Sequence, residues 1–146
     1  MGMEYEVKAE QVVPNVSTVR TKEAQIYFDS SPGQSEHLFN PAELFLSAFA
    51  ACILKNVERF SERLKFAYNK APIKVHGVRE EPPPRLTTIK YELTLYTNES
   101  PQRIDLLRRN LEKYGTIYNT VANTCEISGE IIPVNPVDQS DIHTPI

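Results

Sequence analysis

The sequence contains few of the residues that would mark a metal site or a disulfide scaffold. It has two cysteines, three histidines and no tryptophan, and neither a C-x-x-C motif nor a histidine-rich cluster occurs. Two cysteines are too few for a disulfide framework, and their spacing matches no metal-binding motif. We therefore expect no metal and no other cofactor, so any chemistry should be thiol chemistry.

Charge and hydropathy exclude two classes of partner. The formal net charge is -3, and no Lys/Arg cluster exceeds the pair Arg108 and Arg109, so neither nucleic acid nor an acidic membrane is an expected partner. No run approaches the roughly 20 apolar residues of a membrane span, and the charged, alternating N-terminus is unlike a signal peptide. We expect a cytoplasmic protein. A length of 146 residues, of which 40% are hydrophobic, predicts a single domain over residues 1–146.

Alternation of apolar and polar residues predicts an antiparallel meander in the first part of the chain. Residues 4–13, 16–20 and 24–30 have the period of strands, with short polar turns between them. The aperiodic loop at 30–40 ends at Asn40, a favoured N-cap, which Pro41 follows. Glu43 stands at the third helical position, where its carboxylate can reach back to the cap. A helix with a capping box is therefore predicted to begin at Pro41.

The predicted helix continues to about Tyr68, which is long for so small a domain. Residues 44–54 are apolar almost all round, whereas residues 55–65 carry charges on one face. A helix that is apolar on every side must be buried on every side. Either a sheet and a second helix of the same chain enclose it, or a partner subunit does.

The remaining pattern completes an α+β fold. A second strand pair is predicted at 73–81 and 85–97, joined by three prolines, and a helix should begin after Ser100 and end at Gly115. One or two helical turns and a last strand at 124–134 follow. Residues from about 136 to 146 are predicted to form a surface tail.

Cys52 lies about three turns inside the long helix. Judged from its surroundings alone, it is more often a packing residue than a reagent, because free cysteine is among the most buried residue types. At this depth the backbone N–H groups are already bonded, and the helix dipole offers little support to a thiolate. A reactive Cys52 would therefore need a cation from elsewhere in the chain.

The stretch NPAELFLSAFAAC at residues 40–52, followed by a long helix, resembles the osmotically induced and organic hydroperoxide resistance (OsmC/Ohr) family. The order of predicted elements agrees with that family over nearly the whole chain. The resemblance implies an intertwined homodimer with two central helices packed together. It also implies reduction of organic hydroperoxides by a helix cysteine, which is regenerated through a disulfide with a second cysteine.

The resemblance assigns roles to three residues. Cys52 falls on the peroxidatic cysteine, whose thiolate attacks the peroxide and becomes a sulfenic acid. Arg20 falls near the arginine that would supply the cation and orient the peroxide; without the resemblance it would be an ordinary surface arginine. The carboxylate that pairs with this arginine is replaced by Ala42, and Glu43 is one residue later, about 100° around the helix. Glu43 therefore either reaches Arg20 or only completes the capping box.

A second departure concerns the regenerating cysteine. Gly115 occupies the position where the family's second cysteine belongs, and Cys125 lies ten residues further on, in the predicted last strand. Cys125 can pair with Cys52 only if their Cα atoms approach within roughly 7 Å. Otherwise it is an ordinary strand residue, and an external thiol must reduce the sulfenic acid. Four aromatic residues either wall an apolar pocket near Cys52 or pack in the core: Phe45, Phe49, Tyr114 and Tyr118.

Two functional hypotheses remain from the sequence. The first is an OsmC-like thiol redox protein that acts on an organic hydroperoxide through Cys52 and Arg20. The alternative is a non-catalytic OsmC-like homodimer that binds a hydrophobic or acyl small molecule beside Cys52, and Ala42 and Gly115 favour it. A purely structural dimer is the third reading.

Overall fold

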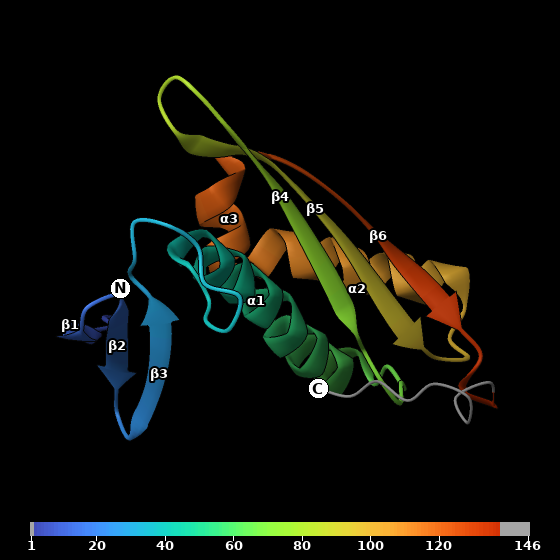
Figure 1. Cartoon of the computed structure of the whole chain (residues 1–146). Coiled ribbons are helices and arrows are strands. Elements are labelled where there is room, and N and C mark those ends of the chain that lie inside the picture. Colours follow the sequence, from blue (N-terminus) through green and yellow to red (C-terminus); the bar gives the residue numbers. More distant parts are fainter. Residues whose placement is uncertain (1, 138–146) are drawn as a thin grey trace. The chain divides into compact units, whose positions relative to one another are not determined.

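The computed structural model describes residues 2–137, which form two compact units (Figure 1). One unit comprises the described residues up to Phe45, the other those from Leu46 on, and each is described by itself. The predicted surface tail, about residues 136–146, lies almost entirely outside the described residues. The single-domain organisation and the homodimer stay predictions.

The first unit is built on an antiparallel three-stranded sheet, which confirms the predicted meander. Its strands β1 (Lys8–Val13), β2 (Val16–Thr21) and β3 (Ala24–Asp29) pair in the order β1-β2-β3. The first strand was predicted from residue 4, but its pairing begins at Lys8, opposite Arg20. Since β2 ends one residue beyond Arg20, residues 4–7 have no strand to pair with in this sheet.

Asp29 organises the loop that follows β3. This nearly fully buried residue accepts hydrogen bonds from the backbone N–H groups of Ser31 (2.8 Å) and Ser35 (2.9 Å). Its own backbone N–H donates to the carbonyl of Phe39 at 2.8 Å. The hydrogen bonds from Ser31, and then from Ser35, hold the pKa of Asp29 below its usual value. The loop is therefore fixed just before the residue that caps the long helix.

The long helix α1 (Pro41–Leu64) begins where the sequence predicts but ends four residues before Tyr68. Lys65 adopts a left-handed backbone conformation, with φ of 51°, which terminates a helix although glycine is the usual residue there. The guanidinium of Arg103 donates to the carbonyls of Leu64 (2.7 Å) and Lys65 (3.1 Å). These last carbonyls are thus satisfied by a side chain that is distant in sequence.

The second unit contains a mixed three-stranded sheet, β4-β5-β6. β4 (Ile73–Glu80) and β5 (Arg85–Tyr96) are antiparallel, whereas β5 and β6 (Glu126–Val134) are parallel. The connection from β5 to β6 contains α2 (Pro101–Tyr114) and α3 (Thr116–Ala122), and the helices lie together beside the sheet (Figure 1). The predicted second helix, the following helical turns and the last strand are confirmed.

Alternating residues of β5 face the helices and form the core with them. Tyr91 and its neighbours on this strand face are almost completely buried, as is one face of α1 and of α2. The most completely buried residues of this core are Phe49, Ile53, Val57, Ile89, Tyr91, Leu93, Leu95, Leu107 and Leu111.

Part of the surface of α1 is exposed within residues 2–137. Phe45 is 42% exposed, Leu54 is 37% exposed, and Ala48 and Ala51 are also exposed. Within residues 2–137 the same chain encloses the helix only on its core face, and enclosure by a partner subunit stays a prediction. Among residues 2–137, no helix combines the length and the apolar character that crossing a membrane requires.

Candidate functional site

Cys52 is a free, half-buried thiol that lies against the junction of α2 and α3. A Cβ atom added at Gly115, the junction residue, would lie 3.3 Å from Sγ of Cys52 and 3.1 Å from the carbonyl oxygen of Leu111. The sulfur therefore faces bare backbone at this point. Gly115 has φ of -76°, so its lack of a side chain matters here through space and not through backbone conformation.

Asn56 directs an amide N–H towards the sulfur of Cys52, with Nδ2 3.9 Å from Sγ. It follows Cys52 by one helical turn and is only 7% exposed. A fixed amide donor in a buried setting stabilises negative charge on a neighbouring atom. The sequence analysis did not single out Asn56. A polar residue on the apolar face of α1, one turn from the cysteine, is the signal that could have found it.

The four predicted pocket aromatics have different neighbours. The Phe49 ring is 5.8 Å from that of Tyr118, whereas the Tyr114 ring lies 5.4 Å from that of Phe60. Burial, and then the charge of Glu112, raise the pKa of Tyr118.

Tyr118 also lies close to Gly115 at the junction of α2 and α3, since a Cβ added at Gly115 would be 2.9 Å from the Cβ of Tyr118. Phe49 and Tyr118 thus line the surroundings of Cys52 within the second unit. Phe45 belongs to the first unit. A pocket shared by the four aromatics stays a prediction.

Cys125 lies one residue before β6, not inside the last strand as predicted. Its thiol donates to the carbonyl of Leu86 at 3.2 Å, which holds the sulfur towards the start of β5. Both thiols are free in the structure, and a resolving role for Cys125 stays a prediction. In the part of the chain that the structure describes, no three His, Cys, Asp or Glu side chains gather to hold a metal ion.

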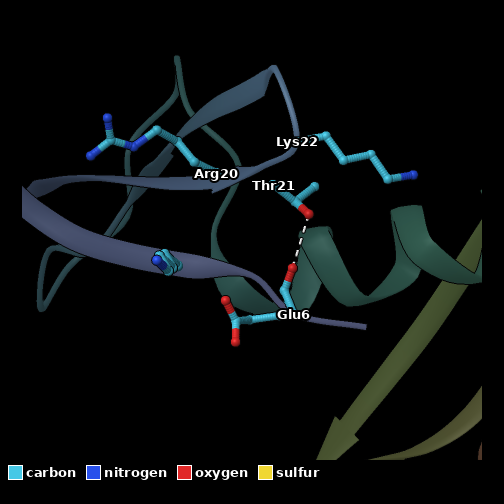
Figure 2. A pocket seen from close by; sticks show the side chains of 5 residues that line it. Glu6, Arg20, Thr21 and Lys22 are labelled. Carbon is cyan, nitrogen blue, oxygen red and sulfur yellow. Dashed lines mark hydrogen bonds between the residues drawn. The ribbon is translucent and has the colours of Figure 1, made fainter. Parts of the chain in front are cut away.

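Arg20 is exposed near the end of β2 and forms an ion pair with Glu10, with Nη2 3.3 Å from Oε1. It lines a shallow pocket of about 380 Å³ with Glu6, Lys8, Thr21 and Lys22. Figure 2 shows the side chains of Arg20 and Lys22 extending to opposite sides. An exposed ion pair of this kind contributes little to the free energy of folding. Arg20 can therefore exchange Glu10 for another anion. Its action at Cys52 stays a prediction.

Glu43 completes the predicted capping box at the start of α1. The backbone N–H of Asn40 donates to the Glu43 carboxylate at 3.0 Å, and the backbone N–H of Glu43 donates to the Asn40 side chain at 2.8 Å. This reciprocal pair confirms the cap. A role for Glu43 as the partner of Arg20 stays a prediction.

A family model and the similar solved structures indicate the same fold. The family model described as OsmC-like protein matches residues 33–130. An OsmC-like protein from Mycoplasma pneumoniae is 22% identical, with a TM-score of 0.84 over 92% of this chain and 100% of that chain.

Two further solved structures are organic hydroperoxide resistance proteins. The one from Legionella pneumophila is 13% identical, with a TM-score of 0.70 over 90% of this chain and 99% of that chain. The one from Elizabethkingia anophelis, with bound thiocyanate, is also 13% identical, with a TM-score of 0.73 over 92% and 100%. At these identities the likeness shows the fold. No curated protein of known function matches this sequence.

Proposed function

Because this chain belongs to the OsmC-like protein family, we propose that it is a thiol redox protein that reduces organic hydroperoxides through Cys52. The observation that carries the proposal is the free Cys52 sulfur, which faces backbone at Gly115 and receives the amide of Asn56. Two proteins of the same fold are called organic hydroperoxide resistance proteins. The active form in this proposal is a cytoplasmic homodimer, in which the partner covers the exposed apolar residues of α1.

The proposed reaction transfers one oxygen atom to sulfur. The Cys52 thiolate attacks the terminal peroxide oxygen, an S–O bond forms as the O–O bond breaks, and the organic alkoxide takes a proton to leave as an alcohol. Cys52 becomes a sulfenic acid. The Asn56 amide stabilises the charge on sulfur before the attack. Arg20, in the role that the family resemblance implies, stabilises the charge that develops on the leaving oxygen.

An external thiol then regenerates Cys52 in this proposal. Gly115 provides no second sulfur at the position that touches Cys52, and the thiol of Cys125 is directed to the carbonyl of Leu86. Both observations favour a reductant from outside the chain.

The second candidate is a non-catalytic homodimer that binds an apolar or acyl ligand beside Cys52. The same glycine favours it, since it provides no second sulfur to act as a redox partner of Cys52. Ala42 favours it as well, because no carboxylate stands at that position to pair with Arg20.

Alkylation of Cys52 as a function of pH separates the two candidates. Mass spectrometry follows both cysteines, so Cys125 serves as an internal control, and the rate reports the fraction of thiolate. We expect Cys52 to react faster than Cys125 near neutral pH, and Arg20→Gln to remove the difference. Lys8→Gln, a matched loss of charge on the neighbouring strand, should leave it intact. Equal rates for the two cysteines would favour the ligand-binding protein.

A further inference from the structure

Three cations lie around two packed aromatic rings of the second unit, of which Phe60 is buried and Tyr114 is exposed. The rings of Phe60 on α1 and Tyr114 on α2 are 5.4 Å apart, and Tyr114 is 48% exposed. Cζ of Arg59 lies 5.4 Å and Cζ of Arg63 5.7 Å from the centre of the Phe60 ring, while Nζ of Lys113 lies 5.1 Å from that of Tyr114. We call Arg59, Arg63 and Lys113 the cationic cluster.

None of these cations forms an ion pair within residues 2–137, whereas Arg103, Arg108 and Arg109 each do. Glu58 and Glu62 each precede an arginine on α1 by one residue and lie about 100° away from it around the helix. Glu62 also follows Arg59 by three residues on the same face, but no ion pair joins the two within residues 2–137. Contact with the ring faces offsets part of the repulsion among the three cations. Like charges gathered in this way raise the local concentration of anions.

The cationic cluster lies on the same flank of α1 as Cys52. Arg59 follows Cys52 by seven residues, which is close to two full turns and about 10 Å along the helix axis. The end of α2 connects the two places, because Tyr114 packs on Phe60 and the next residue, Gly115, lies against the Cys52 sulfur. A molecule that reaches the sulfur beside Gly115 can therefore place a second group among the cations.

We propose that the cationic cluster binds the anionic group of the thiol that reduces Cys52. The inference rests on the proposed function, since the peroxide must first leave a sulfenic acid on Cys52. The sulfur of the anionic thiol forms a disulfide bond with Cys52, and the sulfenic hydroxyl leaves as water. A second molecule of the thiol then cleaves this mixed disulfide, which releases reduced Cys52 and the disulfide of the external thiol. The reductant is thus a small thiol with carboxylates or phosphates several bonds from its sulfur.

The test compares glutathione with its diethyl ester, which keeps the thiol and the peptide but replaces both carboxylates with neutral ethyl esters. Cys52 is converted to a thiopyridyl disulfide with neutral dithiodipyridine in a Cys125→Ser background, and the release of thiopyridone is measured. This preparation needs no peroxide. After correction for the thiolate fraction, glutathione should react about tenfold faster at low ionic strength, because the cations attract it. Added salt should reduce this preference.

Variants assign the preference to particular cations. Arg59→Gln combined with Lys113→Gln should remove it. The matched control, Lys74→Gln with Lys90→Gln, removes two exposed cations from the face of the sheet away from the helices and should retain it. If the first double variant fails to fold, Lys113→Gln alone should lower the preference.

Two results would overturn the inference alone: equal rates for the two thiols in the parent protein, or a preference that survives loss of the cluster. Failure of the proposed function is a distinct result. If the proposed function is wrong, an organic hydroperoxide leaves Cys52 unoxidised. The cationic cluster then has no sulfenic acid to help reduce, and its proposed role is wrong as well.

Discussion

At the scale of single residues, the backbone of Gly115 lies against the Cys52 sulfur. By the resemblance to the family, Gly115 stands where the second cysteine belongs. An added Cβ at Gly115 would lie 3.3 Å from Sγ of Cys52. In a disulfide bond the Cβ atom of one cysteine lies about 3 Å from the sulfur of the other, so the two distances are similar.

Gly115→Cys should therefore form an intramolecular disulfide with Cys52 on mild oxidation. Peptide mapping without reduction would detect it, and protection of Cys52 from alkylation should accompany it. Gly33→Cys, on a loop with open space around it, is the control and should leave Cys52 free. A Gly115→Cys protein in which Cys52 stays alkylatable after oxidation would contradict the contact.

Gly129 is required by Tyr91, its partner in the parallel pairing of β5 and β6. A Cβ at Gly129 would lie 2.0 Å from Cε1 of the Tyr91 ring, and the ring is fully buried with its hydroxyl bonded to Glu112 at 3.0 Å. Gly129→Ala should lower the free energy of unfolding by about 3 kcal/mol, at the upper end for an overpacked core. Urea unfolding would measure it. Gly33→Ala should have almost no effect, and equal stability of the two variants would contradict the packing.

The sequence predicted some of these residues and not others. Cys52 and the Asn40–Glu43 cap stand in a short local motif, so their positions could be inferred directly. The position of Asn56 beside Cys52 could be predicted only by knowing which face of α1 is buried. The contact of Gly129 with Tyr91 also depends on the register between β5 and β6. Neither is visible before the elements are packed.

Among the elements, α1 depends on a cap that can be tested alone. Asn40→Ala removes the side-chain acceptor of the Glu43 backbone N–H and should lower the free energy of unfolding by about 1 kcal/mol. Asn40→Asp keeps the acceptor and should cost much less. Chemical denaturation of both variants would measure the difference, and equal losses would show that the side-chain cap contributes nothing.

The other end of α1 shows why one boundary was mispredicted. Nothing in residues 64–68 is a strong helix breaker, so the local pattern continued the helix to Tyr68. The actual end is fixed by Arg103, which donates to the carbonyls of Leu64 and Lys65 from another helix. Tertiary contacts of this kind override local propensity. The starts of α1 and α2 were predictable because each has its own capping residue.

For the whole molecule, acid should weaken both units. The pKa values of three carboxyl groups lie below their usual values: Asp29 because of its hydrogen bonds from Ser31, Glu99 because of the backbone N–H of Ala67, and Asp105 because of Arg108. A lowered folded-state pKa contributes stability above the unfolded-state pKa, near 4, and this stability is lost as the pH falls through the folded-state value.

The free energy of unfolding should therefore fall as the pH is lowered from about 5 to about 3. Urea unfolding at several pH values would measure it. Glu99→Gln should reduce the acid dependence, because it removes one of the titrating groups. Stability that rises on acidification would contradict the assignment.

At the same scale, the sequence predicted the class and order of the elements but not the direction of the last strand. β6 runs parallel to β5 because α2 and α3 form the connection between them. Alternation of residues predicts a strand but not its direction.

Formation of a sulfenic acid at Cys52 tests the central claim most directly. The reduced protein is exposed to cumene hydroperoxide, the sulfenic acid is trapped with dimedone, and mass spectrometry measures labelling at both cysteines. The account predicts rapid labelling of Cys52, slower labelling with hydrogen peroxide, and little at Cys125. If Cys52 were labelled no faster than Cys125, hydroperoxide reduction through Cys52 would be wrong.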